Sequence, residues 1–239
     1  MEILAIIPVR GGSKGIPGKN IKPLAGRPLL AYTVDAALNS KYITRTVVST
    51  ESEKIKETAK SLGVEVLDRP AELAQDETKT APVLLHVVDE LEKKEGYKPD
   101  VVVLLQATCP LRDTKELDAA IELFLKKEKK GIDSVFAAKS LGTTHSKWRK
   151  SPFSQSEIVY ECLFDYRNRP RRQDSDKHYP LFTETGATYI IKTDVMKKVK
   201  DFIGEKPELY LDGSCVDIDN PEDFDRAEKI LEKRRLEAD

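Results

Sequence analysis

The chain has 239 residues, which is long enough to bury a sizeable core in one α/β domain. Its 40 Lys and Arg residues nearly balance 41 Asp and Glu residues, so no overall field attracts nucleic acid or an anionic membrane. Three widely spaced cysteines and three histidines without ligand spacing indicate neither a disulfide framework nor a zinc site, and we expect reduced thiols.

Short β-branched runs alternate with amphipathic helical stretches along most of the chain. In chain order we expect a strand at residues 3–9, a helix at 28–38, strand 46–49, helix 53–62, strand 64–67, helix 80–94, strand 101–105, helix 114–130 and strand 134–138. Apolar strands without alternation, separated by helices, are typical of a parallel sheet covered on both faces. The sequence therefore predicts an α/β fold with a doubly wound, mostly parallel sheet.

This alternation breaks at residues 140–181, which are polar and basic. So long an irregular stretch is uncommon in a compact domain unless it is functional or forms a small subdomain. We expect a single domain over residues 1–239 with an inserted subdomain at 140–181. Strands are expected again at 187–191 and 215–218, and Asn220 followed by Pro221 predicts the start of a final helix.

The first predicted strand leads into a loop rich in glycine and cations. The loop contains Arg10, Gly11, Gly12, Ser13, Lys14, Gly15, Gly18, Lys19 and Asn20. Backbone N–H groups and positive charges in such a loop can surround a polyphosphate, so we expect it to bind a nucleoside triphosphate. A surface turn with solvated lysines is the alternative, but it does not require so many cations.

Neither of the two common phosphate motifs fits this loop. Ser13 occupies the first glycine position of a P-loop, and Asn20 replaces the hydroxyl residue that holds magnesium there. Pro17 and Pro23 interrupt the helix that a dinucleotide fingerprint needs. A P-loop kinase and an NAD-binding domain are therefore disfavoured.

Polar residues also follow other predicted strands. Arg69 follows strand 64–67, Gln106 follows strand 101–105, and Asp219 follows strand 215–218. Because ligands of open α/β sheets bind beyond the carboxyl ends of the strands, we expect these residues to converge with the glycine-rich loop. Asp217 and Asp219 alternate along a predicted strand and could share one Mg²⁺, although an acidic run that favours the next helix start is the alternative.

Residues 7–20 read IPVRGGSKGIPGKN and resemble the opening of the cytidylyltransferases that make CMP-activated acidic sugars, the CMP-sialic acid synthetase group. Three later segments agree in the same order: RPAELA at 69–74, LQATCPLR at 105–112 and VDID at 216–219. The resemblance implies a nucleotide-diphospho-sugar transferase fold and transfer of CMP from CTP to the anomeric hydroxyl of an acidic 2-keto sugar, with Mg²⁺ as cofactor. It also implies a homodimer that the inserted subdomain helps to form.

The same resemblance assigns roles to individual residues. It implies nucleotide contacts from Arg10, Gly11, Gly12, Ser13, Lys14, Lys19, Asn20, Arg69 and Thr80. It implies contacts with the acceptor sugar from Gln106, Arg112, Lys147, Arg172, Gln173, Tyr189 and Phe202. Asp217 and Asp219 become metal ligands, and Arg10, near the α-phosphate, and Asp219, as a base, become the catalytic candidates.

Some positions depart from the family pattern. Ala107 and Cys109 stand where Pro and Ser are usual, and Thr185 stands where Asn is common. These departures leave the acceptor open between sialic acid or a related nonulosonic acid, 3-deoxy-manno-octulosonate and a sugar 1-phosphate. A silent nucleotide-binding protein is the alternative of a different class.

Several of these residues also have simpler interpretations. Arg112 could merely shape the turn between a strand and a helix. The basic residues at 147–150 and 167–172 could be part of a solvated loop or of a nucleic-acid-binding patch. No charged leader precedes an apolar stretch and no apolar run could span a bilayer, so a cytoplasmic protein is expected.

Overall fold

The computed structural model describes residues 1–13, 15–141, 148–150, 160–162, 181–212 and 215–237. The backbone contacts divide the chain into two units, one made of Met1–Ala137 and Thr185–Asp239 and the other of Ala138–Glu184. The described part of the second unit contains two short antiparallel strands, β8 (Trp148–Lys150) and β9 (Tyr160–Cys162). The segment predicted to be an inserted subdomain falls within this second unit, and its proposed part in dimer formation remains a prediction.

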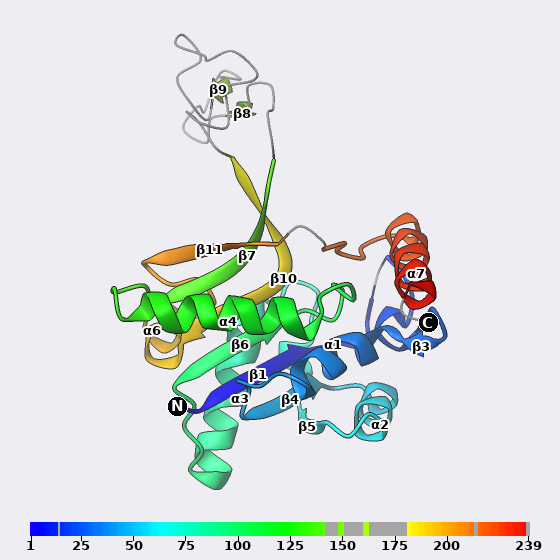
Figure 1. Cartoon of the computed structure of the whole chain (residues 1–239). Coiled ribbons are helices and arrows are strands. Elements are labelled where there is room, and N and C mark those ends of the chain that lie inside the picture. Colours follow the sequence, from blue (N-terminus) through cyan, green and yellow to red (C-terminus); the bar gives the residue numbers. More distant parts are fainter. Residues whose placement is uncertain (14, 142–147, 151–159, 163–180, 213–214, 238–239) are drawn as a thin grey trace. The chain divides into compact units, whose positions relative to one another are not determined.

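The first unit is built on a seven-stranded sheet (Figure 1) with the order β11-β7-β10-β6-β1-β4-β5. The strands are β1 (Ile3–Pro8), β4 (Arg45–Thr50), β5 (Glu65–Asp68), β6 (Val101–Leu105), β7 (Ser134–Ser140), β10 (Phe182–Lys192) and β11 (Pro207–Leu211). β6, β1, β4 and β5 are parallel neighbours, whereas β10 pairs antiparallel with β6. The prediction of an α/β fold with a mostly parallel sheet is confirmed.

Helices cover both faces of this sheet because its central strands are apolar on both sides. The helices are α1 (Leu29–Leu38), α2 (Glu53–Ser61), α3 (Thr80–Glu95), α4 (Thr114–Glu128), α6 (Thr193–Val199) and α7 (Pro221–Leu236). Ile3, Ala5 and Ile7 of β1 face one core, which α1, α2 and α4 close. Leu4 and Ile6 face the opposite core, which α3 and α6 close. This two-sided burial explains why the strand shows no polar alternation.

The prediction of a strand at residues 215–218 is wrong. These residues form no strand, and the edge of the sheet is occupied by β11. Val216 and Ile218 alternate because both are buried in a separate cluster with Leu111 and Phe224. The period-2 pattern therefore reflects packing against α7 and not pairing in the sheet.

A small hairpin follows the glycine-rich loop. It consists of β2 (Pro23–Leu24) and β3 (Arg27–Pro28), and Ala25 and Gly26 turn the chain with φ values of 44° and 81°. Gly26 adopts this left-handed conformation without a side-chain penalty. In the part of the chain that the structure describes, no helix has both the length and the apolar character needed to cross a lipid bilayer.

Candidate functional site

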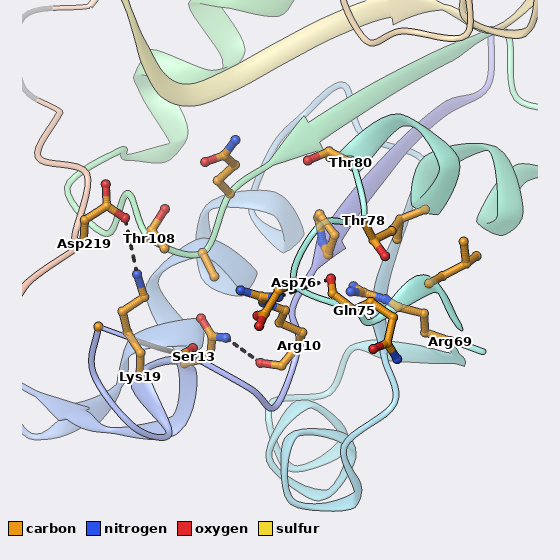
Figure 2. Close-up of a pocket in the computed structure, with 17 residues that line it drawn as sticks. Arg10, Ser13, Lys19, Arg69, Gln75, Asp76, Thr78, Thr80, Thr108 and Asp219 are labelled. Carbon is orange, nitrogen blue, oxygen red and sulfur yellow. Dashed lines mark hydrogen bonds and ion pairs between the residues drawn. The ribbon is translucent and has the colours of Figure 1, made fainter. Parts of the chain in front are cut away.

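A cavity of about 410 Å³ lies at the carboxyl ends of the parallel strands (Figure 2). Four segments that are distant in sequence line it: the loop after β1, residues 69–83 after β5, residues 106–108 after β6, and Asp219. The predicted site residues among its lining are Arg10, Ser13, Lys19, Asn20, Arg69, Thr80, Gln106 and Asp219. The structure thus brings together the four segments expected to converge beyond the carboxyl ends of the strands.

Arg10 is held by the segment that follows β5. Its Nη1 donates to the Asp76 carboxylate at 2.8 Å and to the Gln75 carbonyl at 3.3 Å (Figure 2). Gln75, Asp76 and Thr78 line the cavity but were not predicted as site residues. The available signal was their position in a polar run directly after the RPAELA segment.

Arg69 supplies a buried positive charge at the same cavity. Its Nη2 donates to the Ser49 carbonyl at 2.5 Å, and its Nε donates to the Ser49 hydroxyl at 3.3 Å. Burial lowers the pKa of Arg69, and the nearby Glu51 carboxylate opposes this effect. A guanidinium stays protonated even so, and an anionic ligand would find it already desolvated.

Lys19 connects the glycine-rich loop to the C-terminal part of the chain. Its Nζ donates to the carbonyl of Ile218 and lies 3.7 Å from Asp219 Oδ1 (Figure 2). The backbone at Gly15 approaches so closely that an added Cβ would collide with the Asp219 carbonyl oxygen. Gly15 is therefore needed for close contact between two segments that lie about two hundred positions apart.

Gly11 and Gly12 belong to the loop but are not among the described residues that line the cavity. The Gly11 N–H donates to Glu51 Oε1 at 2.6 Å, and the Ser13 N–H donates to the Gly11 carbonyl at 3.2 Å. These two amides, expected to face phosphate, are thus bonded within the protein. Lys14 lies outside the described residues.

Asp217 lies beside the cavity, close to Gln106. A Cβ added at Gly186, whose φ is 77°, would lie 3.2 Å from Asp217 Oδ2 and 3.3 Å from Gln106 Oε1. Partial desolvation raises the pKa of Asp217, the neighbouring Asp219 carboxylate adds to this rise, and a hydrogen bond from Thr108 opposes it. A cation bound near both carboxylates would offset this repulsion.

The donor set of this pair fits magnesium. Within the described ranges, no three His, Cys, Asp or Glu side chains form a group that could hold a metal alone. Magnesium commonly binds through one or two carboxylates and completes its shell with water and substrate phosphates. Asp217 and Asp219, next to a cavity lined by cations, match that requirement.

The residues predicted to contact the acceptor sugar are only partly brought together. Gln106 lines the cavity, whereas Tyr189 is buried with its ring 4.8 Å from Phe202 and 6.3 Å from Phe136. Neither Tyr189 nor Phe202 is among the described residues that line this cavity. Lys147, Arg172 and Gln173 lie outside the described residues.

Arg112 is buried in the interior. Its Nη2 donates to Thr33 Oγ1 at 2.8 Å, and its Nη1 donates to the Ala187 carbonyl. These contacts tie the turn after β6 to α1 and β10. They favour the alternative in which Arg112 shapes a turn over direct contact with a sugar.

Two cysteines that are far apart in sequence meet beside this turn. Cys109 and Cys215 both donate to the Thr185 carbonyl, at 3.5 and 3.4 Å. Both are free thiols, and no local pattern in the sequence indicates that they are neighbours.

Comparison with known proteins agrees with this geometry. The chain is 35% identical over 241 residues to the CMP-N,N'-diacetyllegionaminic acid synthase of Legionella pneumophila, and the match covers 97% of each. It is 31% identical over 235 residues to an N-acylneuraminate cytidylyltransferase of Escherichia coli, where the match covers 98% of this chain and 53% of that one. The chain thus spans about half the length of this second relative.

A solved structure shares the fold at lower sequence identity. The CMP:2-keto-3-deoxy-manno-octonic acid synthetase complexed with CTP matches with a TM-score of 0.70 and 13% identity, over 98% of this chain and 100% of that chain. A family model described as Cytidylyltransferase matches residues 4–238. With its cation-lined cavity and nearly full-length match, the chain belongs to the cytidylyltransferase family.

Proposed function

We propose that the protein transfers CMP from CTP to the anomeric hydroxyl of an acidic 2-keto sugar of the nonulosonic type. The sugar oxygen bonds to the α-phosphorus, the bond from that phosphorus to the bridging oxygen breaks, and pyrophosphate leaves with the electron pair. The observation that carries the proposal is the single cavity that Arg10, Lys19, Arg69 and Asp219 all line. The names of the relatives from Legionella and Escherichia support the choice of nucleotide and sugar class.

The protein's own residues mainly position the triphosphate and neutralise its charge. Arg69 and Lys19 are held by backbone carbonyls and therefore present fixed positive charges. Arg10 is paired with the partly exposed Asp76 and can exchange this partner for a phosphate oxygen. Arg10 is thus the cation best placed to follow charge that develops at the α-phosphate.

Asp217 and Asp219 would hold Mg²⁺ in this proposal. When bound, the ion neutralises the triphosphate and the departing pyrophosphate. Asp219, which is exposed and beside Lys19, is also the proposed acceptor of the proton from the sugar hydroxyl. Thr80 remains a proposed nucleotide contact and Gln106 a proposed contact with the acceptor.

Further elements of the proposal concern the parts of the chain that the cavity does not include. Lys147, Tyr189, Arg172 and Gln173 would contact the acceptor, with the cations among them suited to its carboxylate, and an apolar wall would lie near Phe202. A homodimer and a cytoplasmic location also remain predictions. Analytical ultracentrifugation tests the dimer, which requires a particle of twice the 26.9 kDa chain mass.

One assay tests the activity and separates the acceptor classes. The protein is incubated with CTP, ATP, GTP or UTP, each with N-acetylneuraminate, N,N'-diacetyllegionaminate, 3-deoxy-manno-octulosonate or a sugar 1-phosphate, and pyrophosphate release is measured. We expect release with CTP and a nonulosonic acid, dependent on added Mg²⁺. Release with a sugar 1-phosphate alone would assign a different acceptor. Binding of CTP without turnover of any acceptor would contradict the enzymatic proposal.

A further inference from the structure

Glu51 directly follows β4, the parallel neighbour of β1, and therefore lies next to the glycine-rich loop that follows β1. Its Oε1 accepts a hydrogen bond from the Gly11 N–H at 2.6 Å. A carboxylate acceptor makes such a bond shorter and stronger than a neutral one. Glu51 is not part of the proposed mechanism, although it contacts the loop on which that mechanism depends.

The contact fixes one particular peptide group. The carbonyl of Arg10 and the N–H of Gly11 belong to the same peptide plane. Asn20 Nδ2 donates to that carbonyl at 3.1 Å, while Glu51 accepts from that N–H. The peptide that follows Arg10 is therefore held at both ends, by two residues from different parts of the chain.

The second carboxylate oxygen of Glu51 has a different environment. Oε2 is buried and makes no hydrogen bond to any residue that the structure describes. The charge of Glu51 is the main effect that opposes the lowering of the Arg69 pKa by burial. The fit is also close, because a Cβ added at Gly11 would lie 3.0 Å from Ser52 Cβ and 3.3 Å from Glu51 Oε1.

We propose that Glu51 is a positioning residue of the triphosphate site, which clamps the Arg10–Gly11 peptide through its hydrogen bond to the Gly11 N–H. This inference rests on the proposed function, since it concerns the loop that would hold CTP. Its consequence is that the Gly11 N–H serves the protein and not the phosphate. Arg10 can then change partners while its backbone stays fixed.

The test compares Glu51→Ala, which removes the hydrogen bond and the charge, with Glu51→Gln, which keeps an acceptor oxygen and removes the charge. Glu53→Gln is the matched control, because the exposed Glu53 starts α2 nearby and pairs only with Lys56 among the residues that the structure describes. Hydrogen exchange at the Gly11 amide and calorimetric binding of CTP and of inorganic tripolyphosphate are measured. The exchange and the calorimetry experiments are carried out at temperatures at which each variant is folded.

We expect Glu51→Ala to speed exchange at Gly11 and to weaken CTP binding by about tenfold or more, as loss of a hydrogen bond to a charged group implies. Glu51→Gln should keep most of the Gly11 protection and weaken CTP binding less. Glu53→Gln should match the wild type. If Glu51 had only a structural role, Glu51→Ala would lower the melting temperature but would not weaken CTP binding by the folded protein.

Unchanged CTP affinity in folded Glu51→Ala, or equal loss of Gly11 protection in both Glu51 variants, would overturn the inference. If Glu51→Ala does not fold, Glu51→Gln and Gly11→Ala decide it, because Gly11→Ala disturbs the same contact from the loop side. Two results together would then support the inference. The Gly11 amide stays protected from exchange in Glu51→Gln, and CTP binds more weakly to Gly11→Ala. If wild-type protein binds no CTP, the proposed function fails, and Gly11 exchange still tests the peptide clamp separately.

Discussion

Asp217 and Asp219 are two positions apart, yet their surroundings give them different properties. Asp219 is exposed and lies beside the Lys19 ammonium, whereas Asp217 lies next to Gln106 and Gly186. The pKa of Asp217 is raised first by partial desolvation and then by the Asp219 charge. Both effects make the charged form of Asp217 less stable than it is in water, and a bound cation would offset them.

Asp217→Asn should reduce turnover with saturating Mg²⁺ by at least about a hundredfold, since the ion stabilises the transition state by several kcal/mol. The same variant should unfold at a slightly higher temperature than the wild type without metal, because the repulsion from Asp219 is relieved. Pyrophosphate release and thermal unfolding with and without Mg²⁺ measure both effects. A metal-induced rise in melting temperature that persists in the variant would show that Asp217 does not hold the ion.

The residues of the site differ in how far the sequence could predict them. Arg10 and Lys19 lie in the glycine-rich loop and Asp219 lies in the VDID segment, so they could be identified without coordinates. Glu51 and Asp76 could not, because each acts on a residue that only strand order or loop packing brings near. The interior position of Arg112 was likewise not visible, since its partners Thr33 and Ala187 belong to distant elements.

Among the elements, α7 has a direct connection to the site. Asn220 accepts from the Asp223 N–H at 3.0 Å, and Asp223 Oδ2 accepts from the N–H groups of Asp219 and Asn220 at 3.2 and 3.3 Å. This capping box satisfies the free amides at the helix start. It also fixes the backbone of a proposed metal ligand.

Asp223→Ala should therefore destabilise the protein by about 0.5–1 kcal/mol and lower kcat/KM several-fold, because the backbone at Asp219 is released. Glu116→Ala is the matched control, since Glu116 completes an equivalent box at the start of α4 with Asp113. Urea unfolding and steady-state kinetics are compared. Equal loss of kcat/KM in both variants would show that the box at α7 has no special link to the site.

The elements themselves were predicted where burial follows the helical or strand period. The apolar runs of β1 and β6 and the helical pattern of α3 were recognisable because each is buried on defined faces. The error at 215–218 arose because Val216 and Ile218 alternate against α7, and a period of two does not reveal whether a strand partner exists. The antiparallel direction of β10 also depends on a connection that no local pattern specifies.

At the scale of the whole molecule, charged side chains join elements across the surface. Arg45 of β4 binds Glu65 of β5 at 2.7 Å and Glu95 of α3 at 2.8 Å, and its guanidinium lies 4.8 Å from the Tyr97 ring. An arginine that pairs with two carboxylates and an aromatic ring is better fixed than an isolated surface pair. This group therefore links three elements of the first unit.

Arg45→Met should lower stability by about 1 kcal/mol, equivalent to about 2–4 °C in melting temperature, and the difference from wild type should shrink in high salt. Lys41→Met is the control, because Lys41 forms a more exposed pair with Glu122. Differential scanning calorimetry at low and high ionic strength gives both values. A loss that does not depend on salt would point to lost packing of the arginine stem instead.

Lys19 and Ile218, which are 199 positions apart, touch at the wall of the cavity. Because this contact joins residues near both ends of the sequence, the ligand site is complete only in a chain that contains both of them in the folded arrangement. A ligand that binds there stabilises the completed fold by mass action and cannot favour a fragment that lacks either terminus of this contact. Nucleotide binding by this chain should therefore report complete folding. Shortened versions that end before residue 218 should lose both nucleotide binding and cooperative unfolding.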